Sequence, residues 1–215
     1  PDHPRAGMSK QTVYPLSETV VAIAVADAAT AQALAAQLRA SGDWLDVVAG
    51  LNSVAAQFDA QTTSPETAAN RLQAAARASQ PALTDTAPPL QIAVRYGGAD
   101  GPDLANTCAR LGLDEASCIA RPPAPLYTAE MIGFTPGFAY LSGLNRALSV
   151  PRLARPRLRV PAGSVGISGA YSGLYALPGP GGWPLIGCTD AALFSAHRED
   201  PFLIHPGRRI RFVPA

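Results

Sequence analysis

The sequence predicts an α+β protein of two domains, an N-terminal domain with β-α-β-β-α-β order and a C-terminal β-barrel domain. Strand and helix patterns alternate in the first half of the chain. After Arg121, prolines and glycines recur every few residues and leave room only for short strands, which favours a closed or nearly closed barrel. We place the two domains at residues 10–85 and 90–215.

Composition allows a well-packed core and excludes several function classes. Of the 215 residues, 47% are hydrophobic and 15% are charged, which argues against a disordered chain. A formal net charge of +1 gives no general attraction to nucleic acid or to an anionic membrane. The sequence shows neither a signal-peptide pattern nor an apolar run long enough to span a bilayer. We therefore expect a cytoplasmic protein that contacts neither nucleic acid nor a membrane.

The first predicted elements are a buried strand and an alanine-rich helix. Residues 19–26 are mostly apolar and rich in β-branched side chains, which is typical of a buried strand. Asp27 is a suitable N-cap for a helix over 28–40. Gly42 lies where glycine ends a helix in the left-handed conformation.

The next elements complete the order of the N-terminal domain. Short strands over 44–49 and 53–59 flank a hairpin turn, and Ser64-Pro65 begins a helix that extends to about residue 79. With a further strand over 90–96, the order matches the split βαβ pattern of ferredoxin-like domains. That last strand can instead belong to the second domain, because the proline-containing segment 80–89 is the natural linker.

Cysteines and histidines are too few and too scattered to predict a metal site. The chain has an odd number of cysteines, Cys108, Cys118 and Cys188, and none forms a C-x-x-C pair. We therefore predict free thiols and no cysteine zinc site. The histidines form no H-E-x-x-H or H-x-H pattern; they are His3, His197 and His205.

Four segments of the second half combine turn-forming glycines and prolines with large aromatic residues. They are 133–144, 151–169, 171–189 and 205–215. Rigid loops with aromatic walls and a few polar groups are typical of small-molecule sites. We predict substrate-binding roles for the following residues, although the aromatic ones can equally belong to the core: Phe134, Phe138, Tyr140, Arg157, Ser164, Tyr175 and Trp183.

The motifs in these segments resemble one known family. Three segments resemble the patterns of the B subunit of bacterial 5-oxoprolinase: GFTPGFAYL, PRLARPRLRVPAGSV and YALPGPGGWPLIG. This family is also known as allophanate hydrolase subunit 1 and as the sporulation-kinase inhibitors. The resemblance covers most of 97–215, whereas the first half is similar only in element order and in the pair Phe58-Asp59. It implies a cyclophilin-like barrel behind the small α/β domain.

The chain departs from this family pattern at several positions, which suggests a diverged paralogue. A histidine common in the family is replaced by Arg121, and a motif arginine is replaced by Cys188. Further departures are Ser17-Glu18 for Gly-Asp, Ala176 for a proline, and Arg208 for an aspartate.

The resemblance implies a subunit of a hydrolase complex that opens the lactam of 5-oxoproline to glutamate with ATP. This chain has no nucleotide-binding motif, because PGPGGW at 178–183 lacks the lysine of a phosphate loop. We therefore expect the chain to bind no cofactor and to be inactive alone, with ATP at a partner subunit. The expected partners are a C-type subunit, similar to allophanate hydrolase subunit 2, and an A-type subunit.

Two assignments stay open at the level of the residues. Ser164 lacks the G-x-S-x-G spacing and an evident base, so a substrate-orienting hydroxyl is favoured over a nucleophile, and the catalytic residues remain unidentified. Four arginines lie within eight residues: Arg152, Arg155, Arg157 and Arg159. Their guanidiniums can bind a carboxylate or a phosphate, or they can form a solvated face of the protein.

Other functions remain alternatives. The same module occurs in urea carboxylase, so a carboxyltransferase component of a urea carboxylase or allophanate hydrolase system is one alternative, and a histidine-kinase inhibitor is another. Peptidyl-prolyl isomerase activity is disfavoured, because a shared fold does not imply a shared function.

Overall fold

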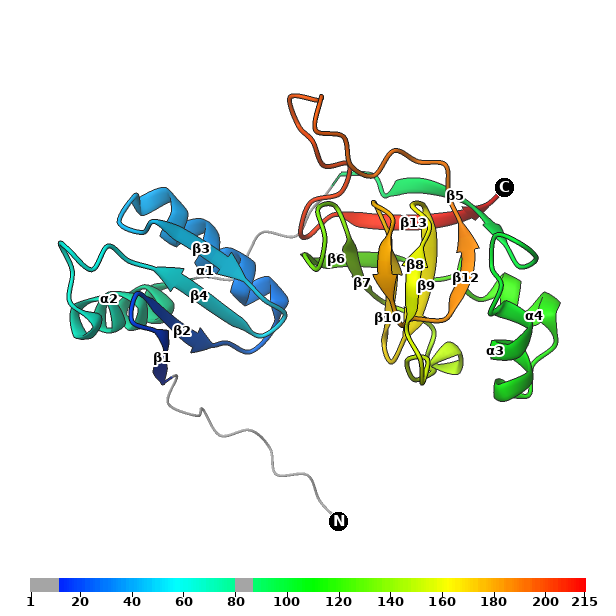
Figure 1. Cartoon of the computed structure of the whole chain (residues 1–215), viewed down its shortest axis with the longest axis horizontal. Coiled ribbons are helices and arrows are strands. Elements are labelled where there is room, and N and C mark those ends of the chain that lie inside the picture. The colour runs from blue at the N-terminus through cyan, green and yellow to red at the C-terminus, as the bar shows by residue number, and fades with distance from the viewer. Residues whose placement is uncertain (1–11, 80–86) are drawn as a thin grey trace, which may run out of the picture. The chain divides into compact units, whose positions relative to one another are not determined.

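The computed structural model describes residues 12–79 and 87–215, and the chain divides into two compact units, Pro1–Leu83 and Thr84–Ala215 (Figure 1). Each unit has its own hydrophobic core. Most of the predicted linker, residues 80–86, lies outside the described residues.

The first unit is a four-stranded antiparallel sheet with two helices packed against it. Its strands have the order β1-β2-β4-β3, and Ile23, Leu34 and Leu72 lie fully buried between sheet and helices. The elements are β1 (Val13–Ser17), β2 (Val20–Ala24), α1 (Ala28–Ser41), β3 (Asp46–Ala49), β4 (Ser53–Gln57) and α2 (Pro65–Ala78).

The predicted helix boundaries of the first unit are confirmed by their caps. The side chain of Asp27 accepts a hydrogen bond from the backbone N–H of Thr30, and Gly42 ends α1 with φ 72°. Ser64 caps α2, with Pro65 at its first helical position.

The ferredoxin-like assignment of this unit is not confirmed, since the strand predicted at 90–96 belongs to the barrel. That strand, β5 (Leu90–Tyr96), pairs with two barrel strands and not with the first sheet. The edge strand β1 was not predicted, because its side chains are mostly exposed and it contains Pro15, which weakens the strand pattern.

The second unit is a closed barrel of seven strands with the order β10-β7-β6-β13-β5-β12-β9. Only β13 and β5 are parallel neighbours. The remaining elements are α3 (Leu104–Leu111), α4 (Glu115–Ala120), β6 (Tyr127–Ile132), β7 (Ala139–Ser142), η1 (Arg146–Leu148), β8 (Arg157–Val160), β9 (Ser164–Ser168), β10 (Tyr171–Leu174), β11 (Gly179–Gly181), β12 (Leu185–Cys188) and β13 (Arg209–Pro214). Strands β8 and β11 form a separate two-stranded sheet.

This architecture confirms the α+β class and the barrel. The strand predicted at 90–96 forms as β5, whereas α4 was not predicted. In the described parts of the chain, no helix is both long and apolar enough to cross a bilayer.

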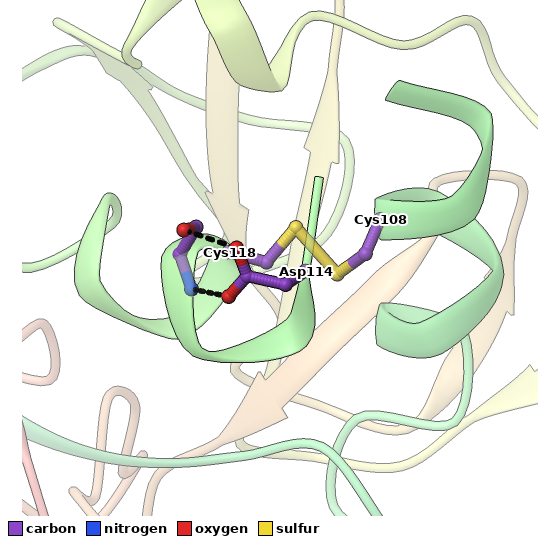
Figure 2. Close-up of a disulfide and its surroundings, with 4 residues drawn as sticks. Cys108, Asp114 and Cys118 are labelled. Carbon is purple, nitrogen blue, oxygen red and sulfur yellow. Dashed lines mark hydrogen bonds between the residues drawn. A yellow bond between two sulfur atoms is a disulfide. The ribbon is translucent and has the colours of Figure 1, made fainter. Parts of the chain in front are cut away.

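A disulfide links α3 to α4, so the prediction of three free thiols is wrong for two of them. Cys108 and Cys118 reach toward each other from the two helices, with Cα atoms 6.0 Å apart (Figure 2). The carboxylate of Asp114 caps α4 by accepting hydrogen bonds from the backbone N–H and the hydroxyl of Ser117. Gly112 turns the chain between the helices with φ 66°. Odd cysteine number and spacing did not reveal this pairing, because the turn brings the helices together.

We expect loss of this disulfide to destabilise the barrel unit. Closing a loop with a sequence separation of 10 restricts the unfolded chain, which corresponds to about 2.7 kcal/mol of unfolding free energy. The measurement is urea unfolding of the Cys108→Ser/Cys118→Ser protein, followed by Trp183 fluorescence after replacement of Trp44, the second tryptophan, by Phe. Adding a reductant should lower the stability of the parent protein by a similar amount and leave the double variant unchanged. Equal stability of parent and variant would contradict the pairing.

Candidate functional site

The aromatic residues predicted as substrate-binding lie on the outer side of the barrel wall. Side chains along a barrel strand alternate between interior and exterior. Ala139 and Leu141 of β7 belong to the barrel core, as does Leu174 of β10. Phe138, Tyr140 and Tyr175 therefore face outward. They form a second apolar cluster with Val160 and Leu185.

Two glycines allow this cluster to pack closely against the barrel wall. A Cβ atom at Gly173 of β10 would lie 2.7 Å from Cζ of Phe138 and 2.8 Å from Cζ3 of Trp183. At Gly166 of β9, a Cβ atom would lie 3.0 Å from Cβ of Trp183. These glycines leave a flat surface on which the rings of Phe138 and Trp183 lie.

Phe138 is the centre of the aromatic cluster. Its ring centroid lies 4.8 Å from that of Tyr140, 4.9 Å from Tyr175, 5.5 Å from Phe134 and 5.9 Å from Trp183, all with edge-to-face geometry. Tyr140 and Trp183 also contact each other, at 5.8 Å. The structure thus brings together five of the seven predicted site residues. We call Phe134, Phe138, Tyr140, Tyr175 and Trp183 the aromatic cluster.

The two tyrosines of the cluster differ in burial. Tyr175 is buried, and its hydroxyl interacts with the backbone of Trp183. Tyr140 is partly exposed. Burial raises the pKa of both hydroxyls, so each is protonated near neutral pH. Both rings can therefore offer a neutral hydroxyl beside an aromatic face.

Ser164 begins β9 next to the cluster and is buried. Its carbonyl accepts a hydrogen bond of 3.0 Å from the backbone N–H of Tyr175. Within residues 12–79 and 87–215, no hydrogen bond joins the Ser164 hydroxyl to a histidine, and His205 contacts Asp200 instead. A serine without a base is a weak nucleophile, so the geometry favours a positioning or structural hydroxyl.

Arg157 is engaged by an acidic residue of its own unit. Its Nη2 lies 2.7 Å from Oδ1 of Asp103, while Oδ2 of Asp103 accepts a hydrogen bond of 2.6 Å from the backbone N–H of Leu185. Asp103 thereby connects β8 to the start of β12. The charge of Arg157 is largely compensated, so the carboxylate-binding role predicted for it competes with this ion pair.

Arg152 lies near the cluster. From the sequence it is named only as one of four arginines in one segment and is not placed among the predicted site residues. The following residue, Leu153, donates a 2.7 Å backbone hydrogen bond to Gly182, which directly precedes Trp183. Arg152 is exposed, and its positive charge opposes the rise in pKa of Tyr140 and Tyr175 that burial causes. The signal that pointed to it was four arginines in one segment, but spacing alone did not distinguish among them.

Phe134 stands at the exposed edge of the cluster in a strained conformation. It is the one non-glycine residue with positive φ in the described parts of the chain, at 70°, and 59% of the residue is exposed. The backbone N–H of Thr135 donates to the carbonyl of Gly133, which closes a γ-turn centred on Phe134. Strain of this kind is concentrated at functional sites and clamps.

We expect Phe134→Gly to be more stable than Phe134→Ala by about 1 kcal/mol, because only glycine adopts positive φ without a steric cost. Both variants remove the same ring, so their difference isolates the backbone conformation. Urea unfolding followed by Trp183 fluorescence gives this difference. Equal stabilities would show that the turn at 134 carries no strain.

The arrangement offers several groups that can bind a small molecule. No group of three or more His, Cys, Asp or Glu residues is placed to hold a metal ion in the described part of the chain. Aromatic faces, neutral hydroxyls and a nearby guanidinium are the groups that hold a small planar molecule with an anionic substituent.

Comparison with known proteins identifies the family. The profile of the carboxyltransferase domain, subdomains C and D, matches residues 11–204. The chain belongs to this carboxyltransferase-domain family. It is 36% identical to the B subunit of 5-oxoprolinase from Haemophilus influenzae over 209 residues, which cover 94% of this chain and 96% of that protein.

A second relative is more similar over a shorter region. Over 125 residues the chain is 50% identical to the 5-oxoprolinase B subunit of Escherichia coli O157:H7, and this match spans 58% of this chain and 57% of that protein.

Two solved structures share the fold of this chain. The crystal structure of TTHA0988 superimposes with a TM-score of 0.78 at 36% identity, covering 91% of this chain and 39% of that one. Urea carboxylase of Kluyveromyces lactis superimposes with a TM-score of 0.76 over 94% of this chain and 21% of that one. At 14% identity, the second likeness shows the fold alone.

Proposed function

We propose that this chain is the B subunit of a 5-oxoprolinase complex, an ATP-dependent hydrolase that opens the lactam of 5-oxoproline to glutamate. The observation that carries this proposal is the nearly full-length match to the H. influenzae protein of that name. The barrel in this proposal is of the cyclophilin-like type, and its outer wall carries the substrate.

The aromatic cluster supports a substrate-binding role. 5-Oxoproline is a small, nearly planar lactam with one carboxylate, and an aromatic wall with polar groups at its edge is suited to such a molecule. The hydroxyl of Tyr140, a partly exposed residue, is available as a polar contact to the lactam.

A partner subunit supplies the ATP site. An amide carbon is a poor electrophile, so ATP first phosphorylates the lactam oxygen and leaves as ADP. One water then attacks the activated carbon, and the C–N bond breaks as the nitrogen takes up a proton. A second water hydrolyses the resulting acyl phosphate to glutamate and phosphate. The sequence of this chain contains no phosphate loop with its lysine. We therefore assign the nucleotide to the A-type or C-type subunit of a cytoplasmic assembly.

Carboxyl transfer is the second candidate, favoured by the carboxyltransferase description of the family. Its chemistry moves a carboxyl group from biotin to a small amide, and the sequence of this chain has no M-K-M biotin attachment motif. A biotin-bearing partner would then be required.

Reconstitution tests the proposal. We expect glutamate, ADP and phosphate to form from 5-oxoproline and ATP only when this chain is combined with A-type and C-type subunits, and not with this chain alone. Omission of each subunit in turn is the control. Turnover by the isolated chain, or carboxylation of an amide by the assembly with a biotin carboxylase, would reject it.

A further inference from the structure

We propose that Arg152 forms a carboxylate subsite at the edge of the aromatic cluster and selects substrates that carry a negative charge beside an amide. This inference rests on the proposed function and names the residue that recognises the acidic group. Arg157 was the residue predicted from the sequence for that role.

The position of Arg152 follows from the backbone around it. The hydrogen bond from Leu153 to Gly182 fixes the 151–153 segment beside the turn that leads into Trp183. Gly182 also lies against Pro156, whose Cγ would be 3.5 Å from a Cβ atom at that glycine. Leu153 and Pro156 are thus both held beside Gly182, next to the cluster.

The guanidinium of Arg152 has no acidic partner in the described residues, whereas that of Arg157 has one and leaves only its buried Nη1 without a hydrogen bond. Throughout residues 12–79 and 87–215, no hydrogen bond or ion pair holds the guanidinium of Arg152, which is exposed. Arg157 is paired with Asp103. A carboxylate is bound most strongly by a guanidinium that has no competing acidic partner.

Arg152 lies close enough to the cluster to act electrostatically on two of its tyrosines. Arg152 influences both Tyr140 and Tyr175, and Arg157 influences Tyr175. Arg155 is exposed, like Arg152, and lies three residues from it. Arg155 therefore provides a control of equal charge in the same segment.

The test compares two ligands of nearly the same shape, 5-oxoproline with its negative charge and its neutral carboxamide. Both are titrated into the protein with Trp44 replaced by Phe, alone and together with its partner subunits, and binding is followed by Trp183 fluorescence and calorimetry. We expect 5-oxoproline to bind at least about tenfold more tightly than the carboxamide, since a charge-assisted hydrogen bond contributes about this factor. Arg152→Gln should abolish that preference, Arg152→Lys should restore part of it, and Arg155→Gln should leave it unchanged.

The outcomes separate this inference from the proposed function. If 5-oxoproline binds and Arg152→Gln retains the full preference for it over the carboxamide, the subsite is wrong and the lactam substrate stands. If the parent protein binds neither ligand, alone or with its partners, both proposals fail. Loss of preference in Arg155→Gln as well would show a diffuse effect of charge and reject a specific subsite.

Discussion

Replacement of Phe138 by Ala should lower the unfolding free energy of the barrel unit by about 4 kcal/mol, because it removes a buried ring and leaves a cavity. Phe138 is 2% exposed and contacts the four other rings of the aromatic cluster. Each edge-to-face pair adds to the loss beyond burial alone. Urea unfolding with Trp183 as the fluorescent probe measures the effect.

Two further variants define the origin of this loss. Phe138→Leu retains apolar volume and should recover part of the stability. Phe202→Ala removes a partly exposed ring that pairs with Phe194 at a centroid distance of 5.4 Å, outside the cluster, and should cost less. If Phe138→Ala and Phe202→Ala were equally destabilised, the cluster would not be a cooperative unit.

Local signals predicted both helices of the first unit and the mixed α+β class. Caps such as Asp27 and Ser64 act within three residues, so they are visible in the sequence and form as expected. The assignment of strand 90–96 was ambiguous, because its alternation is compatible with either sheet. The strand belongs to the barrel because it pairs with β13, more than one hundred residues away, and such a distant pairing leaves no local signal in the sequence.

The residue types of the candidate site could be predicted from the sequence, but its long-range ion pair and its backbone strain could not. Glycines and aromatic residues indicated Phe138, Tyr175 and Trp183, which do meet in space. The ion pair of Arg157 with Asp103 joins residues 54 positions apart, and no spacing rule reveals it. The strain at Phe134 could not be predicted either. A backbone with positive φ usually carries glycine, and a phenylalanine gives no sign that the chain adopts that conformation.

Asp103 lies where three parts of the barrel unit meet, and its position explains why Arg157 is not free. It precedes α3, accepts one hydrogen bond from Arg157 of β8 and another from the backbone of Leu185 in β12. The backbone N–H of Asp103 also donates to the carbonyl of Leu185 at 3.0 Å. The side chain of Asp103 is 13% exposed and that of Arg157 is 29% exposed, so water compensates these groups only in part.

We therefore expect Asp103→Ala to destabilise the barrel unit by about 3–4 kcal/mol, because removing one partner leaves a partly buried charge and an N–H without an acceptor. Urea unfolding of the single variants and of Asp103→Ala/Arg157→Leu gives the coupling energy. The double variant should be more stable than the sum of the two single losses predicts, since it no longer carries the uncompensated guanidinium.

The matched control is Arg159→Leu, which removes an exposed arginine two residues along the same strand and should change stability little. Additive losses at Asp103 and Arg157 would mean that the ion pair contributes nothing, and would return Arg157 to consideration as the cation that binds substrate.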